Sequence, residues 1–455
     1  MKRMVKGELT AFLSLVFLLL LGLVGAVLES ASIQVMKNEK RADAGRAAES
    51  IFAEYQRDLL EEYGIFALEG SYETGSMSES NILNRLSLYG AENMDKGIEK
   101  IKYLTDESGQ EFYRQAVEVE RIRTGAAVLD EFTGKISVWK EQDQKAEKYG
   151  KENTETSNEL ERMLEQEESD LPSEDNPLEN ISDLKAGSML KIVLPEGFSL
   201  SQKAVSAAQL VSHRELKKGY GIFEEEAMKA GDTIFFNLYL LDKFGNAASP
   251  KEGGALTYEL EYLLEGQESD VANLEAVANK ICLFRVAANY GYLLTDAEKQ
   301  AEAEALAGTL CMFFISPEII PVVKQALLLA WAYGESVMDV RALLEGKKVP
   351  LVKNRENWQL SLSALMKLGE EGTLQDGMDS EDGYSYERYL QVLLFLEKKE
   401  ELTMRALDLV ERNLCVGRGL TWFRADQCIT AAGFDLTSSL RRGVKYRFQT
   451  EFRYQ

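Results

Sequence analysis

The stretch that decides the architecture of this chain is Leu9–Leu28, LTAFLSLVFLLLLGLVGAVL, in which Thr10 and Ser14 are the clearly polar residues. Twenty helical residues at about 1.5 Å each match the ~30 Å hydrocarbon core of a bilayer. The stretch therefore predicts a transmembrane helix over residues 9–28, and residues 1–8 form a basic leader before it.

The orientation of this helix follows from the charges beside it. The leader carries Lys2, Arg3 and Lys6 and is short, which favours a cytoplasmic N-terminus under the positive-inside rule. We therefore expect a single-pass protein of the cell membrane with the bulk of the chain extracellular. A cleaved signal peptide is the alternative, since cutting after Ala31 is open. A second apolar stretch, Leu306–Tyr333, contains two prolines, a glutamate and a lysine, so we predict a buried helix there.

A polar segment continues the apolar helix as a predicted stem. Its apolar residues recur at helical spacing and form one stripe, and Gly64 follows as a natural C-cap. Two interpretations of the stripe are open: a tether helix that packs on its own domain, or a stalk that packs against like stalks. The stripe consists of Ala44, Ala48, Ile51, Tyr55, Leu59 and Tyr63.

Composition divides the rest of the chain into three regions. Residues 29–139 are predicted to form the helical stem and a helical region with breaks at Gly90, Gly97 and Gly109. Within this region, Val117–Phe132 is predicted to pair with the stem as an antiparallel hairpin. Residues 140–186 are predicted to be an acidic linker, because apolar residues are too sparse to offset the entropy of ordering. A charged helix is open for its first part, and the mobile part is predicted at Glu165–Glu179. Residues 187–455 read as the extracytoplasmic α+β domain.

Within residues 187–455 we predict long helices and a small sheet, so the fold class is α+β. Alternating apolar residues predict strands, and longer apolar runs predict helices. The predicted strands are Met189–Leu194, Leu256–Tyr262, Lys347–Val352 at a sheet edge, and Tyr446–Tyr454; the predicted helices are 270–307, Glu318–Leu344 and Tyr386–Cys415.

Composition excludes several classes of protein. The net charge of −23 over 455 residues repels nucleic acid. Four cysteines, Cys282, Cys311, Cys415 and Cys428, are too few for a disulfide-dense scaffold, and they form either one or two disulfides or four buried thiols.

No catalytic, cofactor-binding or metal-binding motif is recognisable. The single histidine, His213, excludes sites built from several histidines, and we expect it on an exposed helix. P-loop, Gly-x-Gly-x-x-Gly and Gly-x-Ser-x-Gly motifs are absent from the sequence. We therefore predict a protein without a cofactor that is not an enzyme, although a hydrolase built on two distant carboxylates stays open.

Six segments resemble a known family. Gly7–Val16, Leu28–Ser32 and Phe52–Ala67 are similar to DUF5702, a family of uncharacterised membrane-anchored proteins from clostridia-like bacteria. Three later segments are similar to it too: Leu256–Gly266, Ala326–Pro350 and Tyr389–Asn413. That family resembles in layout the TadE/TadG-like pseudopilins of tight-adherence (Flp-type) pili. The resemblance implies leader cleavage between Gly7 and Glu8. The glutamate usual at the fifth position after cleavage is replaced by Phe12, so the leader is either cut or kept as a plain anchor.

The resemblance and the missing motifs together predict a non-enzymatic surface protein, a minor pilin-like component of a Tad/Flp-type pilus or secretion apparatus. Its expected partners are other membrane-anchored pilin-like or Tad proteins, with self-association through the stem. The alternative is a membrane-tethered extracellular hydrolase, or a ligand-binding protein, that acts on cell-wall or sugar substrates.

Overall fold

The computed structural model describes residues 5–125, 127–173, 176–224, 227, 229, 231–369 and 377–454. The chain forms two compact units. Unit 1 comprises residues 1–115, 215–226 and 420–455, and unit 2 comprises residues 116–214 and 227–419. The chain is mixed helix and sheet, as predicted, but the sheet belongs to unit 1. The C-terminal 36 residues therefore group with the N-terminal part of the chain and not with the rest of the predicted 187–455 domain.

Unit 1 is built on a four-stranded antiparallel sheet whose central strand is β3. β2 pairs with β3 along nearly its whole length, and β4 pairs with β3 on residues 431–439. The short β1 pairs with the start of β3. The strands are β1 (Leu68–Glu69), β2 (Met94–Tyr103), β3 (Cys428–Ser439) and β4 (Lys445–Arg453). The prediction of a C-terminal strand is thus confirmed.

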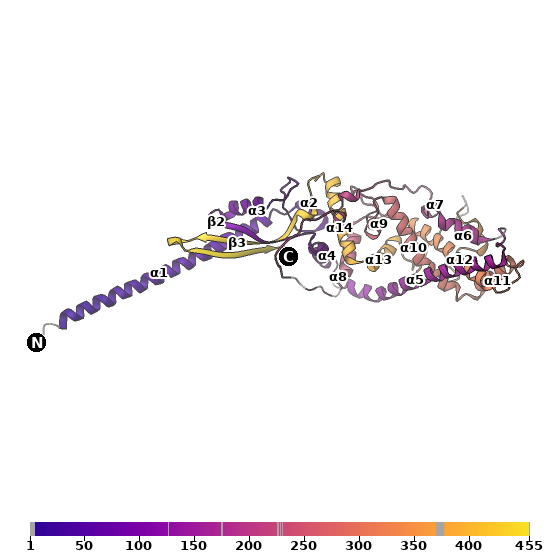
Figure 1. Cartoon of the computed structure of the whole chain (residues 1–455), viewed down its shortest axis with the longest axis horizontal. Helices are drawn as coiled ribbons and strands as arrows, with labels where there is room; N and C mark the ends of the chain where they lie inside the picture. Colours follow the sequence, from indigo (N-terminus) through magenta and orange to yellow (C-terminus); the bar gives the residue numbers. More distant parts are fainter. Residues whose placement is uncertain are drawn as a thin grey trace. The chain divides into compact units, whose positions relative to one another are not determined.

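The long apolar N-terminal helix is α1, Val5–Phe52, and Figure 1 shows its second half running beside the sheet. The predicted continuous helix to Tyr63 is broken after Phe52. The break arises because Tyr55 forms a bridge with Leu68, and because Gln56 caps a new helix by accepting from the backbone N–H of Asp58 at 2.6 Å. That helix is α2, Arg57–Tyr63, and Gly64 is its C-cap with φ of 71°, as predicted.

The core of unit 1 lies between α1 and the sheet. Small residues of α1 allow the helix to lie close to the strands, and aromatic residues of β4 close the end of the core. Phe52 stacks on Phe452 with 4.5 Å between ring centroids, and the ring of Tyr454 packs edge-on against Phe52. The cluster includes Ala44, Ala47, Ala48, Ile51, Phe52, Ile101, Phe434, Leu436 and Phe448.

The prediction that residues 80–140 are mainly helical is wrong at one element. Met94–Tyr103 is the strand β2, although its sequence MDKGIEKIKY was read as helix with a break at Gly97. It becomes a strand through pairing with β3, more than 300 residues later, and such pairing leaves no local signal. The neighbouring elements are helical: α3 (Glu79–Leu86), the π-helical turn Ser87–Ala91, and α4 (Asp106–Thr124). A hairpin between the stem and Val117–Phe132 would join the two units and stays a prediction.

Unit 2 is helical in the residues that the structure describes. Two long, buried helices, α10 and α12, pack together at its centre, and the others surround them. The helices are α5 (Val128–Glu167), α6 (Pro177–Ala186), α7 (Leu190–Val193), α8 (Asp232–Lys243), α9 (Glu259–Glu265), α10 (Asp270–Leu293), α11 (Ala297–Leu310), α12 (Ile319–Leu344), α13 (Tyr386–Leu396) and α14 (Lys399–Gly417). The predicted helix at Glu318–Leu344 is confirmed as α12, and its apolar sequence is buried within unit 2.

Three strand predictions in unit 2 are wrong. Met189–Leu194 contains the short helix α7. Leu256–Tyr262 leads into α9, because the Asp270 carboxylate accepts from the N–H groups of Thr257 and Tyr258 and so fixes a helix start there. Lys347–Val352 forms one isolated bridge, Val349 with Tyr384.

One predicted helix is divided, and one predicted linker is mostly helix. Tyr386–Cys415 is split into α13 and α14 by the extended backbone of Glu397 and Lys398. Most of residues 140–186 is helical, in α5 and α6. α5 packs on the centre of unit 2 through a few well-spaced residues: Trp139 and Tyr149 are buried, and Gln142 donates to the Phe284 carbonyl at 3.2 Å. Sparse apolar residues therefore suffice for this helix.

Candidate functional site

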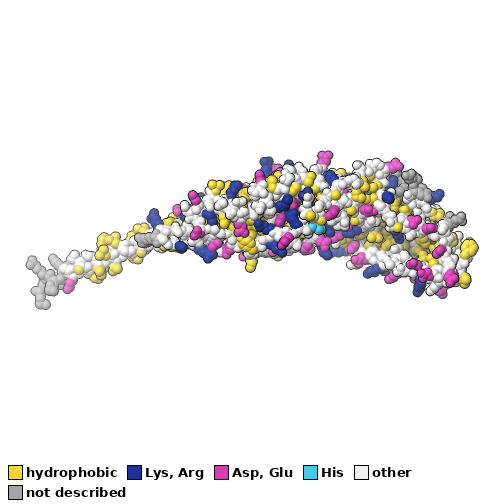
Figure 2. All heavy atoms as spheres, turned by 45° about the horizontal axis from the view of Figure 1, so that its top comes forward, with side chains coloured by type: hydrophobic (Ala, Val, Ile, Leu, Met, Phe, Trp, Pro, Cys, Tyr) yellow, Lys and Arg dark blue, Asp and Glu magenta, His cyan; other side chains and the backbone are white. Residues whose placement is uncertain are grey.

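The strongest candidate for a working part of the molecule is the first half of α1. Within the described residues, Gly7–Phe52 is one helix long and apolar enough to cross a membrane, and none of its apolar part is buried. Leu18 and Leu19 are 66% and 67% exposed. Figure 2 shows these apolar side chains on the surface of the helix. A surface of this kind is stable in lipid and costly in water.

The predicted cleavage residues lie in the first turns of this helix. Gly7 and Glu8 are exposed and helical, and Phe12 is 61% exposed on the same apolar segment. Residues 1–4 of the leader lie outside the described part of the chain. The single long apolar helix is compatible with a membrane anchor, as predicted.

The predicted stem stripe is distributed over two helices and is largely covered. Ala44, Ala48 and Ile51 are buried in the core of unit 1, and Leu59 and Tyr63 are buried on α2. Tyr55 lies between the helices and is 38% exposed. The buried residues of the stripe thus pack within unit 1 itself, which is the arrangement that the tether interpretation predicts.

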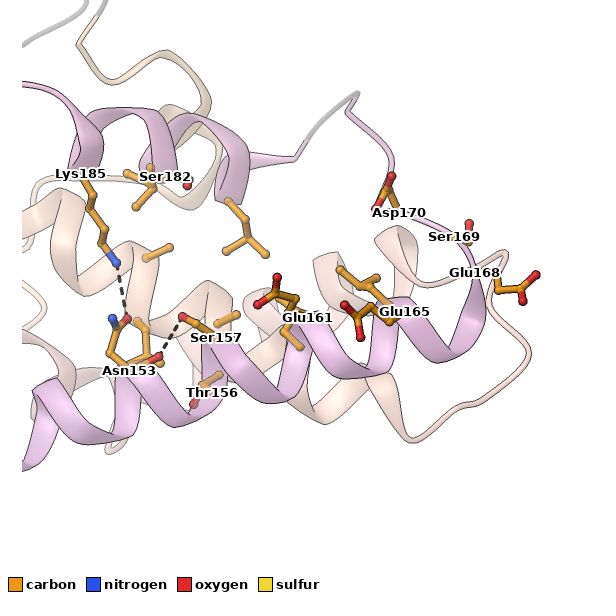
Figure 3. A pocket seen from close by; sticks show the side chains of 17 residues that line it. Asn153, Thr156, Ser157, Glu161, Glu165, Glu168, Ser169, Asp170, Ser182 and Lys185 are labelled. Carbon is orange, nitrogen blue, oxygen red and sulfur yellow. Dashed lines mark hydrogen bonds between the residues drawn. The ribbon is translucent and has the colours of Figure 1, made fainter.

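Unit 2 contains a cavity of about 650 Å³ among α5, α6 and α12. Figure 3 shows Glu161 and Glu165 projecting from successive turns of α5, and Lys185 reaching from α6 to Asn153. The Lys185 Nζ donates to Asn153 Oδ1 at 3.4 Å. The lining also includes leucine, isoleucine and alanine side chains, so the cavity combines an apolar wall with an acidic rim of Glu161, Glu165, Glu168 and Asp170.

A buried ionic cluster lies at the centre of unit 2. Arg285 Nε lies 2.9 Å from Asp339 Oδ2, and Lys353 Nζ lies 2.6 Å from Asp339 Oδ1. Lys353 also contacts Glu335. Burial alone would raise the pKa of Asp339, but Lys353 and Arg285 together hold that pKa below its ordinary value. Two acids and two bases balance, so the cluster joins α10, α12 and the Lys353 segment as a structural unit.

A second group of buried carboxylates accepts hydrogen bonds from neutral donors. Glu261 accepts from the Ala247 N–H at 2.9 Å and from the Tyr386 hydroxyl at 2.8 Å, and burial raises its pKa to about 7. Glu259 accepts from the Gly245 N–H at 2.8 Å, and burial raises its pKa too. These two carboxylates fix the loop after α8. The sequence does not reveal their role, because a buried glutamate cannot be told from an exposed one by its sequence pattern.

The single histidine takes no catalytic arrangement. His213 Nδ1 lies 2.9 Å from Ser212 Oγ, and the same hydroxyl donates to Asp408 Oδ2 at 2.6 Å. In a serine hydrolase the imidazole lies between the acid and the serine, whereas here the serine lies between the other two. Asp408 also accepts from the Tyr262 hydroxyl at 2.8 Å, so it fixes α14 against its neighbours.

Metal ligands are not assembled in the part of the chain that the structure describes: no group of three or more His, Cys, Asp or Glu residues could hold an ion. The four cysteines are buried thiols that form no disulfide, which agrees with the second of the two alternatives open from sequence. Burial raises the pKa of the Cys282 thiol to about 12 and so disfavours the reactive thiolate.

Comparison with known proteins places the chain in a family. The family of unknown function DUF5702 matches residues 165–440, more than half of the sequence. The chain belongs to the DUF5702 family. No curated protein and no solved structure matches it. The DUF5702 match begins in the last turn of α5, covers the rest of unit 2, and ends in unit 1 one residue after β3.

Proposed function

We propose that this DUF5702 protein is a non-enzymatic, single-pass surface protein that acts as a minor pilin-like component of a Tad/Flp-type pilus or secretion apparatus. The observation that carries the proposal is the first half of α1, an apolar segment of which nothing is buried among the residues that the structure describes. Its N-terminus is cytoplasmic and the two units are extracellular in this proposal.

The buried polar groups support a structural role. The conspicuous carboxylates of unit 2 are occupied with backbone amides, hydroxyls or paired cations, as Asp270, Asp339 and Asp408 illustrate. A hydrolase needs acids that face a substrate, so a hydrolase site in unit 2 would have to use acids outside this buried set, such as Glu161 and Glu165 at the cavity. The burial of the stem stripe also changes where lateral contacts would form: the exposed face of residues 9–28 is the surface that meets neighbouring anchors.

The test is photocrosslinking in native membranes from a photoreactive residue at Leu18 of α1. We expect adducts with other single-pass pilin-like proteins or with a second copy. The same probe at exposed Leu88 in unit 1 is the control and should give none of these adducts. Adducts with lipid alone at Leu18, together with normal pilus assembly and adherence in a deletion strain, would refute the pilus role.

The orientation has a separate test. The native thiols are buried, so a new cysteine at exposed Lys145 reports the side of unit 2 and a cysteine at Glu8 reports the side of the leader. A membrane-impermeant maleimide should label the first in intact cells and the second after lysis. Intact-mass measurement of the purified protein shows whether the chain has lost residues 1–7.

A second function, ligand binding, is favoured by the cavity of unit 2. Its volume of about 650 Å³ lies within the usual range for small-molecule sites. Calorimetric titration with soluble cell-wall fragments tests it: the double variant Glu161→Gln/Glu165→Gln should abolish the heat of binding. Glu159→Gln on the same helix, outside the lining, should retain it. Absence of heat with the native protein eliminates this function.

A further inference from the structure

The turn between β3 and β4 is strongly basic in an acidic protein. Residues 440–447 read LRRGVKYR and carry four basic side chains and no acid, whereas the whole chain has a net charge of −23. Leu440 and Val444 close the turn through an N–H to carbonyl bond of 2.8 Å. The turn is thus a compact, hydrogen-bonded element that is locally basic in an acidic protein.

Two sets of contacts fix how β4 lies on α1. At one end, Lys37 Nζ lies 5.1 Å and Arg41 Cζ 5.5 Å from the centroid of the Tyr446 ring. At the other end, Phe52 stacks on Phe452. Residue numbers rise together along both elements, so β4 runs in the same direction as α1. The turn before Tyr446 therefore points toward the apolar half of α1, as Figure 1 shows.

The level of the turn along α1 follows from helix geometry. Lys37 is nine residues beyond Leu28, or about 14 Å along the helix axis. The headgroup layer extends about 5–8 Å beyond the hydrocarbon core on each side. Because the turn projects from the level of Lys37 back toward Leu28, it lies near the outer edge of the headgroups, within a Debye length of about 8 Å.

The basic groups nearest this level are available for binding. Arg441 and Lys445 are exposed and form no ion pair with any described residue. Lys37 and Arg41 stack on Tyr446 and likewise lack a carboxylate partner among the described residues.

The nearby acids neutralise only part of the basic charge. Arg447 forms an ion pair with Asp435 at 2.7 Å. The acids on the adjacent part of α1 are Glu29, Glu39 and Asp43, and Asp43 is paired with Lys40 and Arg46. Asp95 of β2 lies opposite Thr437, close to the turn, so basic side chains still outnumber acids at this end of the sheet. Figure 2 shows Lys and Arg side chains where the apolar half of α1 ends.

We infer that Lys37, Arg41, Arg441 and Lys445, here called the basic collar, bind the anionic lipid headgroups of the membrane in which α1 is anchored. This inference rests on the membrane anchoring in the proposed function, and it goes beyond it by assigning a ligand to the β3–β4 turn. Each basic side chain close to an anionic surface strengthens binding about fivefold. The collar gives unit 1 a second point of attachment beside α1 and so fixes the angle between unit 1 and the bilayer.

The test is amide hydrogen exchange of the full chain in lipid nanodiscs. Exchange of residues 440–446 should be at least fivefold slower in discs that contain phosphatidylglycerol than in discs of phosphatidylcholine alone. High salt should remove the difference, since it screens the headgroup charge. Arg441→Glu/Lys445→Glu should also remove it, and Arg441→Gln/Lys445→Gln should leave a smaller protection.

The matched control is Lys145→Glu/Arg162→Glu on α5, which changes the net charge equally at exposed positions of unit 2. It should retain the full protection, and near-identical melting curves for the variants confirm folding. Equal exchange in both lipids overturns the inference. Equal protection by soluble polyphosphate in phosphatidylcholine discs overturns the choice of lipid as ligand. A chain that fails to enter discs of either lipid overturns the anchoring itself, which separates that failure from failure of the collar.

Discussion

The core between α1 and the sheet of unit 1 and the core around α10 and α12 of unit 2 are built from different chemistry. In the first, alanine and aromatic side chains interlock, with Ala48 and Phe52 of α1 against β4. In the second, Arg285 and Lys353 are buried and both contact the buried Asp339. The first core depends on the fit of shapes, and the second depends on charge pairing and protonation. Mutations that act on one core should leave the other intact.

The largest expected effect is the loss of one partner from the ionic cluster. Lys353→Met leaves Glu335 and Asp339 buried with a single cation, and breaking a buried pair costs about 3–5 kcal/mol. Thermal melting of the full chain should show destabilisation of unit 2, with the transition of unit 1 unchanged.

Arg355 is the matched control for this change, because its ion pair with Glu298 is exposed on both sides. Arg355→Met should have a small fraction of the effect. If the two variants melt alike, the buried cluster contributes no more than a surface pair.

Removal of an aromatic ring tests the other core. Phe52→Ala should destabilise unit 1 by about 3–5 kcal/mol, because the ring is fully buried and the cavity it leaves is bounded by the sheet. Chemical denaturation followed by hydrogen exchange on β3 measures this. Leu88→Ala, at an exposed position of the same unit, should change stability little. Loss of protection in α10 instead of β3 would contradict the independence of the two cores.

The pH dependence of stability distinguishes the cores without breaking a contact. Burial raises the pKa of Glu261 from 4.5 to about 7, so the folded protein binds more protons than the unfolded chain between these values. The contribution of Glu261 to stability therefore falls as pH rises from 4.5 to 7, by up to about 1.4 kcal/mol per pH unit. Glu261→Gln lacks this titration. Its free energy of unfolding should therefore rise relative to that of the native chain as the pH increases from 4.5 to 7, and the difference should stay constant above pH 7.

Denaturant midpoints of unit 2 at several pH values measure this difference. Glu252→Gln at an exposed position is the control and should run parallel to the native protein. A difference between Glu261→Gln and the native chain that does not change with pH would mean that Glu261 does not titrate in this window.

The smallest effect concerns the close approach of α1 to the sheet. Ala48→Leu adds volume to a filled site and should cost about 1–3 kcal/mol. Ala42→Leu, on the exposed side of the same helix, should be nearly neutral. The melting temperature of unit 1 checks both. Equal values for the two would show that the core tolerates a wider helix spacing.

In both cores, the elements with a local signal were predictable from sequence. The apolar segment of α1, the strand near Tyr446 and α12 follow from their patterns of apolar residues, and the cap follows from the glycine at position 64. β2 was missed because its partner β3 is distant in sequence. The start of α9 was read as a strand because Asp270, a later residue, caps it through its side chain.

The candidate sites divide in the same way. The apolar half of α1 was predictable from composition alone. The cavity beside Glu161 was not, because it arises from the packing of three helices, and the residues around it read as solvated linker. The position of the turn beside Lys37 also requires the register of β4 on α1, which only the fold supplies.

The central strand of unit 1 has a consequence for the order of folding. β3 begins at Cys428, yet β1, β2 and β4 all pair with it. Synthesis proceeds at about 5–20 residues per second, so the face of α1 that packs on the sheet remains without the sheet for tens of seconds. All of unit 2 is synthesised before β3 and can fold first. A chain that stops before residue 428 leaves Phe52 without Phe452, and so exposes an aromatic side chain that the folded unit buries.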